Sequence, residues 1–445
     1  MTASDTIYAL SSGTGRSAIA VIRISGSHTA GVLQAIAGEL PAPRALVLRS
    51  LADPVSREIL DRAMVVWTPG PRSFTGEDCA ELHLHGSPAV LAAMMQALSA
   101  QPHVRPAEPG EFTRRAFLHG KMDLVEAEGL ADLLEARTAG QRRQAYRQMS
   151  GAASAVFETW REELVMIRAG IEAAVDFADE AGVADEASRD IDARIHSLRA
   201  RMEEAVRCSS ASEIVRDGVR VVLAGRPNTG KSSLLNALAR REAAIVSDIP
   251  GTTRDAIEVT LDIHGIPVIL TDTAGLRATA ADRVEEEGIR RSRKHMAEAE
   301  IIIWVWSPDI PGSDVPDATE SPHLIVENKS DLLGGQSGLN RNESETLAIS
   351  TRSGHGIPEV LEQLSALLQH RYGNAESSLF VSARQKLAGE RSIRHLNDAL
   401  AVDPVALELK AEHVRLASDE IGRLTGRLDV EEWLGAIFSR FCIGK

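Results

Sequence analysis

The sequence has little cysteine, no apolar segment long enough to cross a bilayer and no secretory signal. Its 445 residues include three cysteines, Cys79, Cys208 and Cys442. Because they are few, odd in number and widely spaced, they exclude a disulfide framework and suit a reducing compartment. No uncharged apolar run approaches the roughly 20 residues that span a membrane. The start, MTASDTIYAL, lacks a basic stretch followed by an apolar core. We therefore expect a cytoplasmic protein without a membrane segment.

The charge balance argues against nucleic acid as a default partner, because the formal net charge is −14. Hydrophobic residues make up 44% of the chain and charged residues 25%, as in ordinary globular proteins. Positive charge is local, in RTAGQRRQAYR from Arg137 and in RRSRKH from Arg290. Such clusters are more often solvated helix faces than RNA sites, so an RNA partner needs other support.

The first half of the chain changes from a strand pattern to a helical one. Up to about residue 118, short apolar runs alternate with turns in SAIAVIRISG, RALVLRS, AMVVWTPG and AELHLHG, and the helix PAVLAAMMQAL follows. Beyond it, MDLVEAEGLADLLEAR, FETWREELVMIRAGIEAAVDF and IDARIHSLRARMEEAV keep a helical period. We predict a small α/β domain, 1–118, and the first part of a helical domain, 119–215, with two or three long helices.

The second half alternates strands with helices and then returns to helices. The predicted strands are RVVLAG, IPVILTDT, EIIIWVW, HLIVEN and TLAIS, and the predicted helices are SSLLNALARR, EEEGIRRSRKHM and PEVLEQLSALL. This order is typical of a doubly wound, mostly parallel sheet. We predict an α/β domain, 216–376, inserted into a helical domain whose second part, 377–445, has a break at Pro404. The fold class is therefore multidomain, α/β and α.

GRPNTGKS, from Gly225 to Ser232, has the spacing of a P-loop and lies between a predicted strand and a predicted helix. Glycines let backbone N–H groups surround phosphate oxygens, and the helix N-terminus favours negative charge. We expect Lys231 to reach the β- and γ-phosphates and Ser232 to bind Mg²⁺. The sequence therefore predicts a nucleoside triphosphate site.

Two further motifs follow predicted strands and identify the base. DTAG, Asp272 to Gly275, places a carboxylate where Mg²⁺ is bound and an N–H near the γ-phosphate. In NKSD, Asn328 to Asp331, the Asp331 carboxylate can accept hydrogen bonds from the ring N–H and the amino group of guanine. Adenine would leave that carboxylate unpaired, so the expected nucleotide is GTP. Ser350, Thr351 and Arg352 resemble the last guanine-contacting loop of GTPases, with threonine at the usual alanine.

The predicted GTP contacts extend over all of these loops. They are Asn228, Thr229, Gly230, Lys231, Ser232, Ser233, Ser247, Asp248, Ile249, Thr252, Thr253, Asp272, Thr273, Ala274, Gly275, Asn328, Lys329, Asp331, Ser350, Thr351 and Arg352. Small GTPases orient the attacking water with a glutamine directly after the DxxG motif. Leu276 occupies that position here, so another group must orient the water.

Several motifs along the chain resemble the MnmE family, also called TrmE, of tRNA-modifying GTPases. They are RISG, SFTGED at Ser73 to Asp78, PGEFTRRAF at Pro109 to Phe117, GKMDLVEAEG, GTTRD at Gly251 to Asp255, DTAGL and the tail FCIGK. The resemblance covers nearly the full length, and the C-x-G-K tail is highly specific. It departs from the family at Ser12-Gly13-Thr14 and at Met122.

The resemblance implies roles in the GTP site that chemistry alone does not assign. Asn228 corresponds to a potassium ligand, with further oxygens from Ser247, Ile249 and Thr252, and Thr253 corresponds to a magnesium ligand. Glu285 corresponds to the acidic residue that orients water, although the segment before it varies in length. The implied potassium ion would stabilise charge in place of an arginine finger. In the family this site forms when two G domains meet, so a homodimer is implied.

The family architecture implies an N-terminal folate-binding domain, a helical domain and an inserted G domain. The implied folate contacts are Arg23, Glu81, Lys121 and Lys445. The implied reaction uses a tetrahydrofolate one-carbon unit, as a 5,10-methylene or 5-formyl derivative. With the flavoprotein MnmG, or GidA, it adds an aminomethyl or carboxymethylaminomethyl group to carbon-5 of the tRNA wobble uridine.

The tail raises a separate question, because Cys442 lies four residues from the end. The amphipathic run VEEWLGAIFSRF places Val430, Trp433, Leu434, Ile437 and Phe438 on one apolar face, so we expect the tail to be held in place. In the family the C-terminus approaches the folate site across a dimer. Cys442 is then either a nucleophile or acid–base group, or a small packed cysteine. Gly444 and Lys445 fit a prenylation signal poorly.

Two other functions share a GTPase core. A GTP-controlled ribosome-assembly or RNA-binding switch would lack the N-terminal domain and the tail, and usually carries a basic module. A dynamin-like membrane GTPase needs an amphipathic or apolar membrane element, which the sequence does not show. The sequence favours a tRNA modification enzyme over both.

Overall fold

The computed structural model describes residues 5–13, 15–176, 183–241, 258–272, 297, 299–310, 323–333, 346–372, 379–403, 406–428 and 431–445. Contacts divide the chain into two compact units. The first comprises Met1–Ala131, Gln148–Thr159 and Ile421–Lys445, and the second comprises Asp132–Arg147 and Trp160–Glu420. In the described residues, no helix is both long and apolar enough to cross a membrane.

A six-stranded sheet forms the centre of the first unit. Its strands lie in the order β3-β4-β5-β2-β1-β6, and all pairs are antiparallel except β1 with β6. They are β1 (Thr6–Leu10), β2 (Ser17–Ser25), β3 (Val47–Ala52), β4 (Ile59–Thr68), β5 (Cys79–Gly86) and β6 (Val104–Pro106).

The two faces of this sheet pack against different helices, because side chains alternate between the faces along each strand. Ile22, Ile24, Leu82 and Leu84 point to one face, where they pack with residues of α1 (Thr29–Ala37) and α2 (Pro88–Ser99). On the other face, Phe112 of α3 (Glu111–Leu118) packs with Ile7 and Ala9 of β1. Arg23 and Glu81 lie on this second face, since Arg23 pairs with Ala9 and with Glu81.

The C-terminal helix is part of the first unit. In α13 (Glu431–Phe438), Leu434, Ile437 and Phe438 are buried against Leu124, Ala127 and Ala131 of α4 (Leu124–Glu135). Gly110 has φ +68°, and a Cβ there would lie 2.4 Å from the carbonyl oxygen of Phe438. This close packing confirms that the tail is held and not frayed. Val430 and the side chain of Trp433 lie outside the described residues.

Five further helices complete the described helical segments. They are α5 (Ala139–Met149), α6 (Ala152–Asp176), α7 (Val183–Asp217), α11 (Ala383–Ala401) and, after the predicted break, α12 (Leu407–Thr425). Within the second unit, α11 packs along α7, where Arg199 donates to Asn397 Oδ1 over 2.8 Å. On α12, the buried Lys410 donates to Asp192 of α7 over 2.7 Å. Pro404 itself lies outside the described residues.

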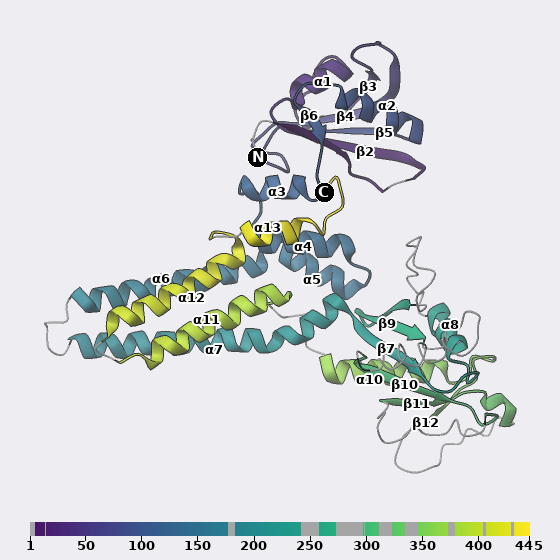
Figure 1. Cartoon of the computed structure of the whole chain (residues 1–445), viewed down its shortest axis with the longest axis vertical. Helices are drawn as coiled ribbons and strands as arrows, with labels where there is room; N and C mark the ends of the chain where they lie inside the picture. The colour runs from purple at the N-terminus through teal and green to yellow at the C-terminus, as the bar shows by residue number, and fades with distance from the viewer. Residues whose placement is uncertain are drawn as a thin grey trace, which may run out of the picture. The chain divides into compact units, whose positions relative to one another are not determined.

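The second unit contains a six-stranded sheet in the order β12-β11-β10-β7-β9-β8 (Figure 1). Its strands are β7 (Val219–Ala224), β8 (Glu258–Ile263), β9 (Ile266–Asp272), β10 (Ile301–Trp306), β11 (Leu324–Glu327) and β12 (Thr346–Ala348). All neighbouring pairs are parallel except β8 with β9. The mostly parallel sheet confirms the predicted fold class.

Two helices, α8 (Lys231–Arg241) and α10 (Ile357–Tyr372), pack against this sheet. Leu234 and Leu238 of α8 and Leu364 of α10 join Val221, Leu223 and Ile303 in one core. A short 3₁₀ helix, η1, spans Ser330–Leu333. The predicted helix at 285–296 lies outside the described residues. Sequence reasoning missed β1, β6, β8, α1 and α3.

Candidate functional site

The P-loop connects β7 to α8 at the carboxyl edge of the sheet. Gly225 has φ +135°, and a Cβ there would lie 2.1 Å from the carbonyl oxygen of Val305 on the neighbouring strand. Gly230 has φ +95°, and a Cβ there would lie 2.1 Å from Asn328 Nδ2. Asn228 also has a positive φ, of 66°. Glycine is therefore required at both ends of the loop for reasons of space as well as of conformation.

Lys231 is folded back over the loop that precedes it. Its side chain is buried, and Nζ donates to the carbonyl oxygens of Gly225 and Arg226, both over 2.8 Å. Thr229 closes the same turn by donating from Oγ1 to Arg226 over 2.9 Å. These bonds fix the ammonium group within the P-loop, where an anion at the helix N-terminus would meet it.

The structure brings together the two oxygen groups predicted to act at magnesium. Ser232 Oγ donates to Asp272 Oδ2, and Asp272 is only 1% exposed. Ser232 lies in the first turn of α8, and Asp272 ends β9, which pairs in parallel with β7. A hydroxyl and a carboxylate are hard oxygen ligands of the kind that Mg²⁺ prefers. The donor set therefore fits that ion.

Asn328 connects the predicted base loop to the P-loop. Its Nδ2 donates to the carbonyl oxygen of Thr229 over 2.9 Å, and its Oδ1 accepts from the N–H groups of Lys329 at 2.8 Å and Thr351 at 3.2 Å. The side chain is 1% exposed. Asn328 is thus a structural link among three of the predicted GTP-binding loops.

Asp331 is positioned by the third of these loops. Ser350 Oγ donates to Asp331 Oδ1 over 2.7 Å, and Ser330 N–H donates to the carbonyl oxygen of Ile349 over 3.0 Å. Ser350 is buried and also accepts from the N–H of Ser353. Because one carboxylate oxygen is held by Ser350, the orientation of the Asp331 carboxylate is fixed before a base arrives.

Sequence reasoning missed one ion pair beside the base loop. Lys329 has φ +65°, and its Nζ donates to Asp309 Oδ2 over 2.7 Å. The hydrogen bonds from Lys329 and Ser307 lower the pKa of Asp309. Asp309 follows β10 at the same sheet edge as the other motifs, and that position is the signal that could have found it.

Many predicted contacts fall outside the described residues. These are Ser247, Asp248, Ile249, Thr252, Thr253, Thr273, Ala274, Gly275, Leu276 and Glu285. The described part of the site therefore comprises the P-loop, Asp272 and the two base loops.

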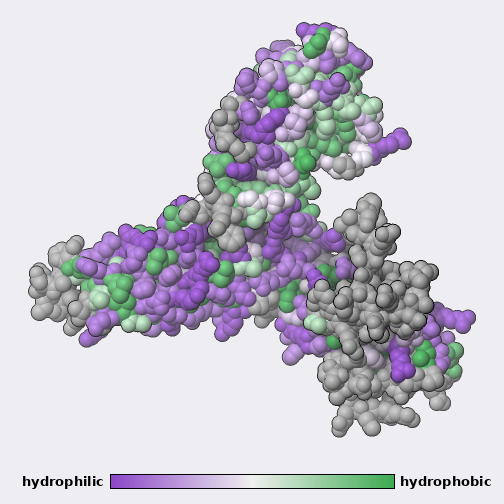
Figure 2. Space-filling model, in the orientation of Figure 1, coloured by the Kyte–Doolittle hydropathy of each residue, from purple (hydrophilic) through white to green (hydrophobic). Residues whose placement is uncertain are grey.

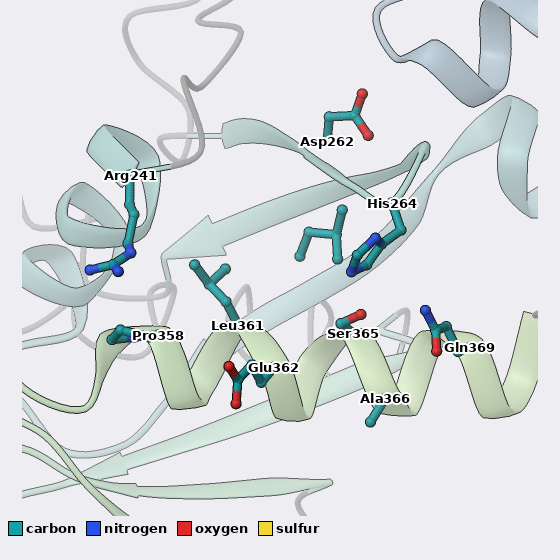
Figure 3. Close-up of a pocket in the computed structure, with 10 residues that line it drawn as sticks. Arg241, Asp262, His264, Pro358, Leu361, Glu362, Ser365, Ala366 and Gln369 are labelled. Carbon is teal, nitrogen blue, oxygen red and sulfur yellow. The ribbon is translucent and has the colours of Figure 1, made fainter.

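A pocket of about 560 Å³ lies elsewhere on the second unit, and Figure 3 shows the residues that line it. It lies between α10, which supplies Leu361 and Ser365, and the β8–β9 hairpin, which supplies His264. Arg241, at the far end of α8 from Lys231, also lines it. An 11-residue helix is roughly 16 Å long, so this pocket is separate from the P-loop.

The candidate folate residues lie in the first unit, where Arg23 and Glu81 pair across β2 and β5. Arg23 donates from Nε at 3.2 Å and from Nη2 at 3.0 Å to Glu81 Oε1. Burial opposes ionisation of Glu81, but the charge and hydrogen bonds of Arg23, with His83, lower its pKa overall. The Arg23 guanidinium also lies 5.0 Å from the centre of the Phe74 ring. Glu81 is therefore an ionised acceptor, and its partner Arg23 lies against an aromatic ring.

Lys121 makes its contacts with other residues than Arg23 and Glu81. Its Nζ donates to the carbonyl oxygen of Pro71 over 3.0 Å, and the residue is exposed. It also lines a cavity of about 620 Å³ whose wall includes Glu126 and the ion pair of Glu158 with Arg427, 3.3 Å apart. Burial raises the pKa of Glu126. Among the described residues, no hydrogen bond or ion pair joins Lys121 to Arg23 or Glu81.

The tail reaches the N-terminal sheet within the same chain. Ser11 Oγ donates to the carbonyl oxygen of Gly444 over 2.9 Å. Gly444 has φ +98°, and a Cβ there would lie 2.2 Å from the carbonyl oxygen of Leu10. Cys442 is exposed while Phe441 is buried, so the thiol is presented and not packed. Lys445 thus lies two strands from Glu81, because Leu10 ends β1 and β2 separates β1 from β5.

Known proteins resemble the chain over its full length. A family model described as the MnmE helical domain matches residues 124–442, and one described as the GTP-binding protein TrmE N-terminus matches residues 6–121. A tRNA modification GTPase MnmE of Methylobacterium sp. strain 4-46 is 49% identical, over 99% of this chain and 100% of that protein. The chain belongs to the MnmE family of tRNA modification GTPases. A second relative of that name, from Bradyrhizobium sp. strain ORS 278, is 47% identical over 99% of both chains.

Family membership makes the chain a GTPase and confirms the predicted enzyme class. The matched N-terminal model also argues against the ribosome-assembly alternative, which was expected to lack that domain. Among solved structures, the G domain of the T. maritima FeoB iron transporter is 23% identical and covers 34% of this chain and 98% of that one. The TM-score of that match is 0.25.

Proposed function

We propose that the protein hydrolyses GTP to drive modification of the wobble uridine in tRNA. The observation that carries the GTP half of this proposal is Asn328, which joins the P-loop to both base loops. Phosphate-binding and base-reading groups are thereby held as one rigid set. The tRNA half rests on the names of the MnmE relatives, which match 99% of the chain.

Guanine is read by Asp331, whose carboxylate accepts two hydrogen bonds from the base. Ser350 holds one carboxylate oxygen, so the group need not reorient when GTP binds. Lys231 and the P-loop N–H groups hold the phosphates, and Ser232 with Asp272 holds Mg²⁺. When bound, Mg²⁺ neutralises charge that develops on the phosphate oxygens.

Hydrolysis transfers the γ-phosphoryl group to water and releases GDP and phosphate. In our proposal Glu285 orients the water, since Leu276 has no group that can do so. Potassium, when bound, adds positive charge at the phosphates, with Asn228, Ser247, Ile249 and Thr252 as its ligands and Thr253 at magnesium. Asn228 supports this set, because its positive φ places it at the bend of the P-loop.

The N-terminal domain, which we propose ends at residue 118, binds a tetrahydrofolate derivative. The ionised Glu81 suits the donor N–H groups of a pterin, and cations such as Arg23, Lys121 and Lys445 suit the carboxylates of its glutamate tail. The folate supplies the one-carbon unit. The flavoprotein MnmG is the proposed partner, and the group added to carbon-5 is aminomethyl or carboxymethylaminomethyl.

A homodimer is part of the proposal, and the N-terminal sheet supports it. Hydrophobic surface gathers on the N-terminal domain in Figure 2. Exposed apolar side chains in and beside its strands include Ile19 at 60%, Leu48 at 46% and Ile59 at 61%. Apolar surface that gathers in this way is typical of an interaction site, and a second copy would cover it.

The test of this proposal is reconstitution with tRNA and the flavoprotein, read by nucleoside mass spectrometry. The expected result is a modified wobble uridine that requires GTP, the folate and both proteins. An unmodified nucleoside in the complete mixture, from protein that hydrolyses GTP normally, would contradict the tRNA half. Equal hydrolysis rates in potassium and sodium would contradict the potassium site.

Folate binding is tested separately by calorimetry. Arg23→Ala should weaken binding at least about tenfold, because it removes a charge-assisted contact and the partner of Glu81. Arg62→Ala, which removes an exposed cation from β4, is the matched control and should bind normally. Equal affinity of both variants would remove Arg23 from the site.

A further inference from the structure

Two histidines, His395 of α11 and His413 of α12, meet between these helices in the second unit. Ser392 of α11 donates from Oγ to the carbonyl oxygen of Ala417 on α12 over 3.0 Å, and this buried bond fixes the helix register. His395 lies one turn after Ser392, and His413 lies one turn before Ala417. Because the ring centroids are 6.4 Å apart, the two imidazoles are neighbours across the helix pair.

Asp398 completes a group of three possible ligands. It follows His395 by three residues, a spacing that places both on one face of α11. One ligand atom from each of His395, Asp398 and His413 lies within 4.8 Å of the others. Ligands in a tetrahedral zinc site lie about 3.3 Å apart, for metal–ligand distances near 2.0–2.1 Å. A modest rotation of the exposed Asp398 and of the half-buried histidines would bring the group to that spacing.

Each of the two imidazoles has a ring nitrogen that lacks a hydrogen-bond partner among the described residues. Nδ1 of His395 and Nδ1 of His413 are both buried, and neither has a hydrogen-bond partner among the described residues. A neutral imidazole carries one donor and one acceptor, so a buried ring nitrogen without a partner costs free energy in either tautomer. A metal ion would use a lone pair from each ring.

Two arginines near His413 are already held by carboxylates. Glu412, beside His413, is held by Arg415 with distances of 2.8 and 2.6 Å, and Arg415 also contacts Asp419. Arg168 pairs with Glu172 at 3.0 Å. Arg168 and Arg415 are therefore engaged by carboxylates, and Asp398 forms no ion pair among the described residues.

We propose that His395, Asp398 and His413 form a site for a divalent transition-metal ion, zinc foremost, that joins α11 to α12. Two imidazoles and a carboxylate suit zinc, cobalt, nickel or copper, whereas magnesium prefers oxygen ligands alone. Three protein ligands leave a position for water. The site is independent of the nucleotide and folate sites, and its role is to fix the helix pair.

The experiment uses the full chain, stripped with EDTA and free of nucleotide. Zinc is titrated by calorimetry, and Co²⁺ is added as a spectroscopic probe. We expect a single zinc equivalent at this site, visible-region Co²⁺ bands without a thiolate charge-transfer band, and a melting temperature that rises with zinc. A thiolate band would instead assign the metal to a cysteine and would overturn the proposal.

Variants identify the ligands. His395→Gln and His413→Gln should each weaken zinc binding by at least about 100-fold, since loss of a supporting residue alone costs 10–100-fold. His196→Gln, which changes an exposed histidine on α7, is the control and should bind zinc normally. Asp398→Asn, at an exposed position, keeps the test valid if a histidine variant fails to fold, and should also weaken binding.

Zinc affinity within about threefold of wild type in all three ligand variants would overturn the proposal. So would an equal loss in His196→Gln, or wild-type binding no tighter than millimolar.

Discussion

At the scale of single residues, the site depends on positions where the chain leaves no room for a side chain. Gly230 illustrates this, because its φ is +95° and a Cβ would meet Asn328 Nδ2 at 2.1 Å. Asn328 is buried and its Nδ2 already donates to Thr229. The motif spacing predicts a glycine there for phosphate access, but only the structure shows that the same glycine admits the base loop.

Gly230→Ala should therefore lower GTP affinity by at least about tenfold, and should destabilise the second unit by about 1–3 kcal/mol through strain. The affinity is measured with a fluorescent GTP analogue and the stability by thermal unfolding. Gly38→Ala is the control, because Gly38 has φ +81° with no atom within 4 Å of its Cβ position. It should cost stability alone. Unchanged GTP affinity in Gly230→Ala would refute the proposed packing of the loops.

Cys442 is the residue whose role the sequence left between chemistry and packing. Its exposure in the single chain favours the chemical role, and the bond from Ser11 to Gly444 holds the neighbouring backbone. We predict that Cys442→Ser retains GTP hydrolysis and folate binding while tRNA modification falls at least about tenfold, because the thiolate is the stronger nucleophile.

Nucleoside mass spectrometry of reconstituted tRNA measures that loss. Ser439→Ala, which changes an exposed hydroxyl on the same segment, is the control. Full modification by the serine variant would show that the thiol takes no part, and an isoprenyl adduct in the intact mass would restore the lipid-anchor reading.

At the scale of elements, charged side chains join α3 to the loops around it. Arg105 Nη2 donates to Glu111 Oε1 over 2.6 Å, and Arg115 bridges Glu111 at 3.0 Å and Glu77 at 2.9 Å. Glu77 also accepts from Ser25. The motifs SFTGED and PGEFTRRAF, which carry the family resemblance, are therefore parts of one ionic network that supports α3.

This network gives a prediction for pH. Burial raises the pKa of Glu111, but the hydrogen bonds from Arg105, the Glu108 N–H and Arg115 outweigh it and lower the pKa overall. A carboxyl with a lowered folded-state pKa stabilises the fold above its unfolded pKa, about 4.3. That stability is lost as the pH falls through the folded-state pKa.

We expect Glu111→Gln to lower stability at pH 7 by about 1–3 kcal/mol and to flatten the acid dependence, as measured by denaturant unfolding from pH 3 to 7. Glu108→Gln changes an exposed carboxyl next to the network and should match the wild type. A Glu111→Gln variant with wild-type acid dependence would contradict the ionised role of Glu111.

Helices and strands could be predicted from the sequence where a binding motif requires them beside it. The P-loop, DTAG and NKSD have fixed spacings because phosphates and guanine impose them, and their strands β7, β9 and β11 were found. β8 was missed although the buried apolar residues Val259, Leu261 and Ile263 alternate with polar ones, and although His264 and Gly265 form a turn. β1 and β6 are short, and they pair in parallel although about a hundred residues separate them. No local pattern in the sequence therefore predicts them.

At the scale of the whole molecule, the resemblance to one family carried more than any periodicity. It supplied the folate and potassium residues, which in isolation are ordinary surface groups. Neither the family resemblance nor the periodicity predicted contacts between residues distant in sequence. Ser11 contacts Gly444 across 433 positions, and Asp309 contacts Lys329. Such contacts depend on packing of the complete fold, which neither spacing nor composition encodes locally. The division at residues 118, 215 and 376 is a proposal.

The central claim is that this chain is a GTPase in which Asp331 recognises the guanine base of GTP. The most direct test is the nucleotide preference of Asp331→Asn, measured as kcat/KM with GTP and with xanthosine triphosphate. The amide turns an acceptor into a donor, so it should pair with the xanthine carbonyl and clash with the guanine amino group. Our account predicts a preference reversed toward xanthosine triphosphate by at least about 100-fold, and a retained preference for GTP would contradict it.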